Sequence, residues 1–101
     1  AGCLGGIWTA GLLSWILDAS NKCGLVSEVT QRMAHHWGEW HGDDFLTRPE
    51  ECKLVLEQLC MEAGVAVRLH TRVVAAHTNR KRITHVVTES KSGREAWAAH
   101  V

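Results

Sequence analysis

The sequence lacks a net charge, a tyrosine and an apolar run long enough to cross a membrane. Eleven basic residues balance eleven acidic ones, so the chain as a whole has no net attraction for nucleic acid or an anionic membrane. The longest apolar run, residues 11–17, is interrupted by Ser14 and falls far short of the ~20 residues of a spanning helix. No basic region precedes this run, so we expect no signal peptide. Partners of nucleic acid or membrane type are therefore not expected.

Cysteine is too scarce and too scattered for a disulfide framework, since the chain has only four. Cys52 and Cys60 lie eight positions apart on a predicted helix, which places them roughly 12 Å apart and beyond disulfide reach. A bond between Cys3 and Cys23 is compatible with the sequence, but nothing requires it. Thiols that stay reduced favour a cytoplasmic location.

Spacings typical of metal ligands are also absent, because no Cys-x-x-Cys or His-x-x-x-His pattern occurs. Histidines and acidic residues do gather within residues 35–44: His35, His36, Glu39, His41, Asp43 and Asp44. We interpret this segment as a polar, solvated loop and predict no metal site. A histidine that binds substrate or transfers a proton is the alternative, because histidine titrates near neutral pH.

Helical periodicity appears twice in the middle of the chain. Apolar residues spaced at three and four predict a helix over residues 25–37. A second helix is predicted over Pro49–Ala63, where Thr47 and Glu50 form a capping box and proline occupies the first turn. Gly64 stands where a left-handed C-terminal cap is expected.

The last third of the chain has the alternation of extended strands. Val65–His70 alternates apolar and polar residues, and strands continue from Thr71 to Val101. One turn is predicted at Asn79-Arg80-Lys81, and a second at Ser90-Lys91-Ser92-Gly93. Since no aromatic residue interrupts the basic run Arg80-Lys81-Arg82, it indicates a charged hairpin turn more than a nucleic-acid patch.

The most informative segment is the first, where glycines alternate with apolar residues in the run Gly2-Cys3-Leu4-Gly5-Gly6-Ile7-Trp8-Thr9-Ala10-Gly11. Glycine allows positive φ angles and lets another group come into contact with the main chain. A cluster this dense, followed by the mostly apolar residues 12–17, favours backbone that lies against a flat ligand.

This run resembles the Cys-Leu-Gly-Gly-x-x-Thr-x-Gly segment of FAD-dependent oxidoreductases with two dinucleotide-binding domains. The resemblance continues through residues 62–65, 69–74 and 88–95. It implies a fold in the α/β class, namely part of a Rossmann-like FAD-binding domain. The expected order is a Gly-rich loop, two helices, a parallel-type strand over Val65–His70 and a three-stranded antiparallel meander. Residues 1–101 would then be a single fragment of that domain, divided into 1–24, 25–64 and 65–101.

The resemblance also implies roles for particular residues, with FAD as the cofactor. Gly5, Gly6, Thr9 and Gly11 match the loop along the flavin, where the glycines would allow close approach and Thr9 would offer its hydroxyl. Two further residues match a strand start that meets the adenine: Val73 and Val74. A redox role for Cys3 is less favoured than a packing role, because no second cysteine follows it nearby. No catalytic residue can be assigned.

Two motifs of the family are absent from the chain. The Gly-x-Gly-x-x-Gly turn that binds the pyrophosphate would precede Ala1, and an Ala-Thr-Gly-type motif would follow Val101. We therefore expect an internal piece of an enzyme that moves hydride or electrons between a small organic substrate and flavin. By itself the chain should bind FAD weakly or not at all, and it should tend to self-associate. The alternative is a stand-alone α+β interaction module without catalysis.

Overall fold

The computed structural model describes residues 1–35 and 37–99. The chain divides into two compact units, Ala1–Val67 and Arg68–Val101. The sequence was interpreted as one fragment of a single FAD-binding domain, and the membership of both units in such a domain stays a prediction. Each unit is described separately below.

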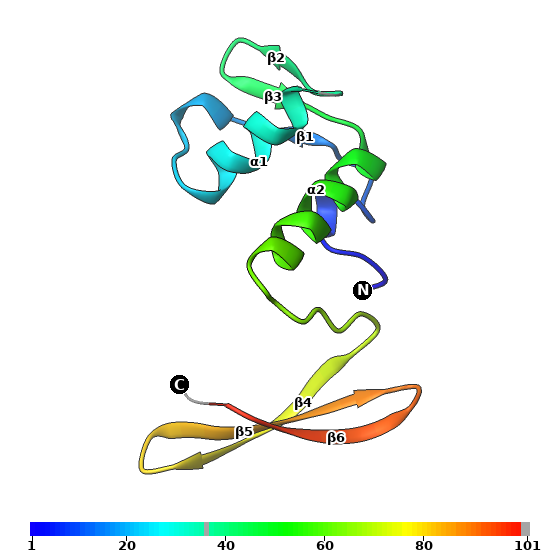
Figure 1. Cartoon of the computed structure of the whole chain (residues 1–101), viewed down its shortest axis with the longest axis vertical. Coiled ribbons are helices and arrows are strands. Elements are labelled where there is room, and N and C mark those ends of the chain that lie inside the picture. The colour runs from blue at the N-terminus through cyan, green and yellow to red at the C-terminus, as the bar shows by residue number, and fades with distance from the viewer. Residues whose placement is uncertain (36, 100–101) are drawn as a thin grey trace. The chain divides into compact units, whose positions relative to one another are not determined.

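Unit 1 contains two helices, a small sheet and two 3-10 turns (Figure 1). The elements in chain order are η1 (Gly6–Trp8), β1 (Trp15–Ile16), η2 (Ala19–Asn21), α1 (Leu25–Ala34), β2 (Glu39–His41), β3 (Asp44–Leu46) and α2 (Pro49–Glu62).

Helix α2 confirms the stronger of the two helix predictions, but not its predicted N-terminal cap. Arg48 is the N-cap and makes no side-chain cap bond, while Pro49 occupies the first turn. Thr47 is buried, and its hydroxyl donates to the sulfur of Met33 at 3.2 Å. The capping box was wrong because the backbone N–H of Thr47 bonds the carbonyl of Ser14 at 3.0 Å, which draws this residue toward β1.

The C-terminal end of α2 matches the prediction. Gly64 has a φ of +67°, its N–H bonds the carbonyl of Met61 at 3.0 Å, and the N–H of Val65 bonds the carbonyl of Cys60 at 2.8 Å. These two bonds form a Schellman motif, which requires a left-handed residue at the position of Gly64.

Helix α1 ends three residues earlier than predicted. The carbonyl of Met33 accepts the N–H groups of Trp37 at 3.0 Å and Gly38 at 3.1 Å, so the chain turns there toward β2. Trp37 does not continue the helix; its ring instead lies 4.4 Å from the guanidinium carbon of Arg48.

The polar loop expected after α1 is in fact a β-hairpin. Strands β2 and β3 pair antiparallel, and β1 joins the other edge of β3 to give the order β1-β3-β2. His41 pairs with Asp44 across a turn in which Gly42 has a φ of +63°. The loop prediction was wrong because Trp40 meets Phe45 edge-to-face, with ring centroids 5.0 Å apart, and Phe45 is fully buried in the core. His36, which the prediction placed in this loop, lies outside the described residues.

The core of unit 1 lies between the two helices and the inner face of this sheet. It consists of six buried apolar residues, of which four are almost completely inaccessible to solvent. The members are Ile16, Ala19, Val29, Met33, Phe45 and Cys52. All four cysteines of the chain are free thiols.

Unit 2 is the predicted antiparallel meander. Strands β4 (Arg72–Asn79), β5 (Arg82–Ser90) and β6 (Gly93–Ala98) pair in the order β4-β5-β6 and form a twisted sheet (Figure 1). Asn79 pairs with Arg82 across a two-residue turn in which Arg80 and Lys81 have φ angles of +47° and +72°. Two successive positive φ angles are typical of a type I′ hairpin turn.

The parallel-type strand expected over Val65–His70 does not form. These residues lie in no strand, and both sheets are antiparallel throughout the described residues. A strand needs a neighbour for its backbone hydrogen bonds, and no strand pairs with this segment. The fold is therefore α/β, with two helices and two three-stranded antiparallel sheets.

None of the helices in the described ranges combines the length and apolar character that a membrane crossing requires.

Candidate cofactor-binding loop

The Gly-rich segment folds into a tight loop closed by its own main chain. Gly5 and Gly6 have φ angles of +96° and +52°, and the N–H of Trp8 bonds the carbonyl of Gly5 at 3.1 Å. The carbonyl of Gly6 accepts the N–H of Gly11 at 3.1 Å, which brings the two ends of the predicted cofactor segment together.

The three glycines of this loop are required for different reasons. A Cβ on Gly5 would lie 2.5 Å from the methyl group of Thr9, and one on Gly11 would lie 2.8 Å from the backbone of Ile7. At Gly5 and Gly11, the space that a side chain would need is therefore already occupied by other atoms of the loop. A Cβ on Gly6 would meet nothing within 4 Å. Gly6 and Gly11 are both exposed, but among the three glycines only Gly6 has open space where a side chain would project.

Thr9 has a structural role in the loop. Its side chain is completely buried, and its hydroxyl donates to the carbonyl of Leu4 at 2.5 Å. A hydroxyl has one proton to donate, so the direct donation to a ligand that the sequence suggested is not seen. That Thr9 belongs to a cofactor-binding segment stays a prediction.

The thiol of Cys3 donates to the Thr9 hydroxyl at 3.6 Å, which supports the packing role favoured for this cysteine. Cys52 is completely buried, and burial raises the pKa of its thiol. A raised pKa disfavours the thiolate that redox chemistry requires.

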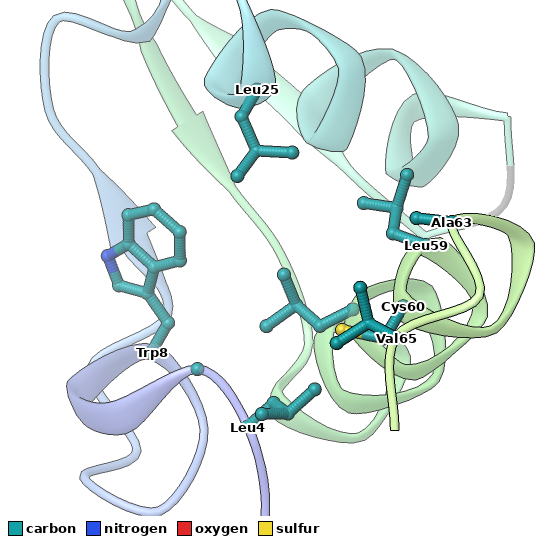
Figure 2. A pocket seen from close by; sticks show the side chains of 9 residues that line it. Leu4, Trp8, Leu25, Leu59, Cys60, Ala63 and Val65 are labelled. Atoms are coloured by element: carbon teal, nitrogen blue, oxygen red, sulfur yellow. The ribbon is translucent and has the colours of Figure 1, made fainter. Parts of the chain in front are cut away.

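An apolar pocket of about 500 Å³ adjoins the loop (Figure 2). The loop contributes Leu4, Gly5 and Trp8 to its wall, and in this view the ring of Trp8 lies across the pocket from residues of α2. The remaining lining residues are Leu25, Leu56, Leu59, Cys60, Ala63 and Val65. Because almost all of these side chains are apolar, the pocket would accept an apolar group and offers no charged partner.

Sequence reasoning missed a cluster on the outer face of the small sheet. The rings of Trp15 and His41 stack with centroids 5.3 Å apart, and the Trp15 indole N–H donates to the Asp44 carboxylate at 3.0 Å. This bond, together with one from the Asp18 backbone N–H at 2.8 Å, lowers the pKa of Asp44. The dipeptide Gly42-Asp43, which lies between aromatic residues, is a hairpin-turn signal that would have revealed this hairpin in the sequence.

Val73 and Val74, the predicted adenine contacts, lie in β4 of unit 2 and are 62% and 38% exposed. Their side chains are therefore accessible, and their role stays a prediction. The described part of the chain holds no group of three or more histidine, cysteine or acidic residues that could bind a metal ion.

The comparison with protein families decides the assignment, because residues 1–101 match the family described as FAD dependent oxidoreductase. The chain belongs to the FAD-dependent oxidoreductase family. FAD is thus the cofactor of this family member, and the predicted resemblance is confirmed over the whole chain. No curated protein and no solved structure matches the oxidoreductase chain.

One feature of the loop in this FAD-dependent oxidoreductase is compatible with a cofactor against the main chain. The open side of Gly6 leaves room for a flat ring against the main chain, where any side chain would intervene.

Proposed function

We propose that the chain forms the flavin-side part of an FAD-dependent oxidoreductase that acts on a small organic substrate. When bound, the flavin supplies a hydride acceptor and donor, which no amino-acid side chain can replace. The observation that supports this proposal is Gly6, whose exposed main chain lies within the segment that the family match covers.

The residues of the loop would have different roles in binding the flavin ring. Gly6 would lie against it, while Gly5, Thr9 and Gly11 would keep the loop in shape through the contacts described above. Val73 and Val74 would meet the adenine half. None of these residues would donate or accept a proton in the reaction, so the chemistry would depend on the flavin and on other groups of the enzyme.

In the parent enzyme, Val65–His70 would pair with strands of a Rossmann-like parallel sheet. Its alternating residues Val65, Val67 and Leu69 are 55%, 39% and 36% exposed, so three apolar side chains are free to be covered. The parent would be cytoplasmic, and the isolated chain would bind FAD weakly and have no activity.

A matched pair of glycine variants tests the proposal. Gly6 and Gly42 both have positive φ angles and both have open space where a Cβ would be added, so alanine should cost each a similar strain of roughly 1 kcal/mol. FAD binding is followed by quenching of tryptophan fluorescence. We expect Gly6→Ala to weaken FAD binding severalfold and Gly42→Ala to leave it unchanged. Equal effects of the two substitutions would contradict a flavin contact at Gly6.

One observation favours the interaction module as a second candidate function. Ile7, Leu12 and Leu13 of the same loop are 60%, 74% and 56% exposed, and neighbouring exposed apolar side chains often mark contact surfaces for proteins.

A further inference from the structure

The neutral chain consists of two oppositely charged units. Unit 1 holds four basic and nine acidic residues, whereas unit 2 holds seven basic and two acidic ones. The formal side-chain charges are therefore −5 and +5, with histidine neutral. This asymmetry is invisible in the net charge of zero, and it becomes apparent once the structure divides the chain after Val67.

The positive charge of unit 2 is concentrated at one hairpin tip. Glu89 pairs with Arg72 at 3.5 Å and with Arg94 at 3.2 Å, and Arg68 lies 4.4 Å from the Trp97 ring centroid. The β4–β5 turn, by contrast, presents three successive cations that form no ion pair within the described residues: Arg80, Lys81 and Arg82. We call these three residues the basic tip.

The basic tip also has an unusual backbone. Arg80 and Lys81 both adopt left-handed φ angles, where asparagine and glycine are the favoured residues of a type I′ turn. A residue with a side chain is strained in this region. Two cations at these positions are therefore not explained by the demands of the turn itself.

Unit 1 has the complementary surface, because its own cations are already engaged. Lys22 pairs with Asp18, Arg32 with Glu28 and Glu62, and Lys53 with Glu50, while Arg48 lies over Trp37. The β2–β3 hairpin retains three carboxylates that have no lysine or arginine partner among the described residues: Glu39, Asp43 and Asp44. We call these three residues the acidic hairpin.

We propose that the basic tip of one copy of this chain docks on the acidic hairpin of a second copy. The surfaces differ, so the contact is head-to-tail and leaves one free surface at each end of a pair. Such an interface extends into chains unless its rotation closes a ring. This inference requires no cofactor and is independent of the proposed FAD site.

Salt should control this association, because exposed charges are screened over about 10 Å at 0.1 M ionic strength. Sedimentation of the full chain in 20 mM NaCl should give an average mass that rises with protein concentration. In 500 mM NaCl we expect at least about a tenfold weaker association. A wild-type chain that stays monomeric in 20 mM NaCl, or associates equally well in both salts, overturns the proposal.

Two variants, each changed on one surface only, make the test specific. The tip variant combines Arg80→Asn, Lys81→Gly and Arg82→Gln, which introduces residues that a type I′ turn prefers. The hairpin variant combines Glu39→Gln and Asp43→Asn. Lys91→Gln, in the other turn of unit 2, serves as the matched control and should associate like the wild type.

Mixing the two variants distinguishes a head-to-tail contact from simple loss of folding. Each variant alone should be monomeric in 20 mM NaCl, but an equimolar mixture should form dimers and nothing larger, because each copy retains one working surface. A mixture that stays monomeric overturns the proposal, as does self-association of the tip variant. Association that disappears after nuclease treatment also overturns it, since nucleic acid would then bridge the basic tips.

Discussion

The two units differ in how their structure is held together as well as in the sign of their charge. Unit 1 surrounds a core in which Phe45 and Cys52 are fully buried. In unit 2 every residue of β4 is exposed, and Thr88 is the one buried residue within its described range. A three-stranded sheet without a packed apolar face is marginally stable in water. Hydrophobic burial therefore stabilises unit 1, whereas strand pairing stabilises unit 2.

Phe45→Ala should show the largest difference between the units. Removing a fully buried phenylalanine costs about 3–5 kcal/mol, which is enough to unfold a small domain. Val73→Ala, on the exposed strand β4, should change stability by less than about 0.5 kcal/mol. Thermal unfolding followed by circular dichroism and hydrogen exchange of each unit measures both effects. Equal destabilisation by the two substitutions would contradict a core confined to unit 1.

Gly38→Ala tests how tightly this core is packed. An added Cβ would overlap the ring of Phe45, and overpacking of this kind costs about 1–3 kcal/mol. Gly64→Ala is the matched control, because its Cβ would enter open space and only its positive φ opposes the change, at roughly 1 kcal/mol. Urea titration measures both. A smaller cost at Gly38 than at Gly64 would show that the ring moves freely.

The basic tip offers a substitution that strengthens unit 2 alone. Arg80→Asn with Lys81→Gly replaces two strained residues by the pair that a type I′ turn favours, so we expect a gain of about 1 kcal/mol. Slower hydrogen exchange of the β4–β5 amides, with no change in unit 1, is the expected readout. Faster exchange would mean that the arginine and lysine side chains stabilise the turn.

Acid should weaken unit 1 selectively. Hydrogen bonds from Arg32 lower the pKa of Glu62, and bonds from Trp15 and the Asp18 backbone lower the pKa of Asp44. Because these folded-state pKa values lie below the unfolded ones, their stabilisation is fully present above the unfolded value of about 4 and is lost as the pH falls through the folded value. Both residues lie in unit 1.

Melting temperatures measured between about pH 5 and pH 2 check this expectation. The melting temperature of unit 1 should fall over this range, and Glu62→Gln should make the fall less steep. Glu57→Gln, a neighbouring glutamate on α2 without a basic partner in the described ranges, should leave the slope unchanged. An equal effect of the two substitutions would contradict a specific role for the Arg32–Glu62 pair.

Local sequence patterns predicted some elements well, but they failed where contacts between residues distant in sequence determine the structure. The helical spacing of apolar residues and Gly64 predicted the bounds of α2 closely. The turns at Arg80 and Gly93 predicted the meander. Both signals depend only on residues that are neighbours in the sequence. The hairpin at Gly42 was missed, since its stability comes from Trp40 on Phe45 and from pairing with β1. The strand at Val65–His70 was predicted from alternation and from the family resemblance, although a strand also requires a neighbouring strand.

The candidate site shows the same division. The density of glycines predicted both the position of the loop and the family, since both predictions depend only on consecutive residues. The inward direction of the Thr9 hydroxyl was not predictable, because it depends on how the loop closes on Leu4. The division of charge between the units also required the structure, which showed where one unit ends.

Amide NMR of the ¹⁵N-labelled chain tests the central claim most directly, because it detects millimolar complexes residue by residue. Such a complex corresponds to about −4 kcal/mol. With FMN, which carries the flavin without the adenine, we predict shifts centred on Gly5, Gly6 and Ile7. ADP should instead shift Val73 and Val74. FMN shifts confined to unit 2, or none in the Gly-rich loop, would contradict the assignment of this loop to the flavin.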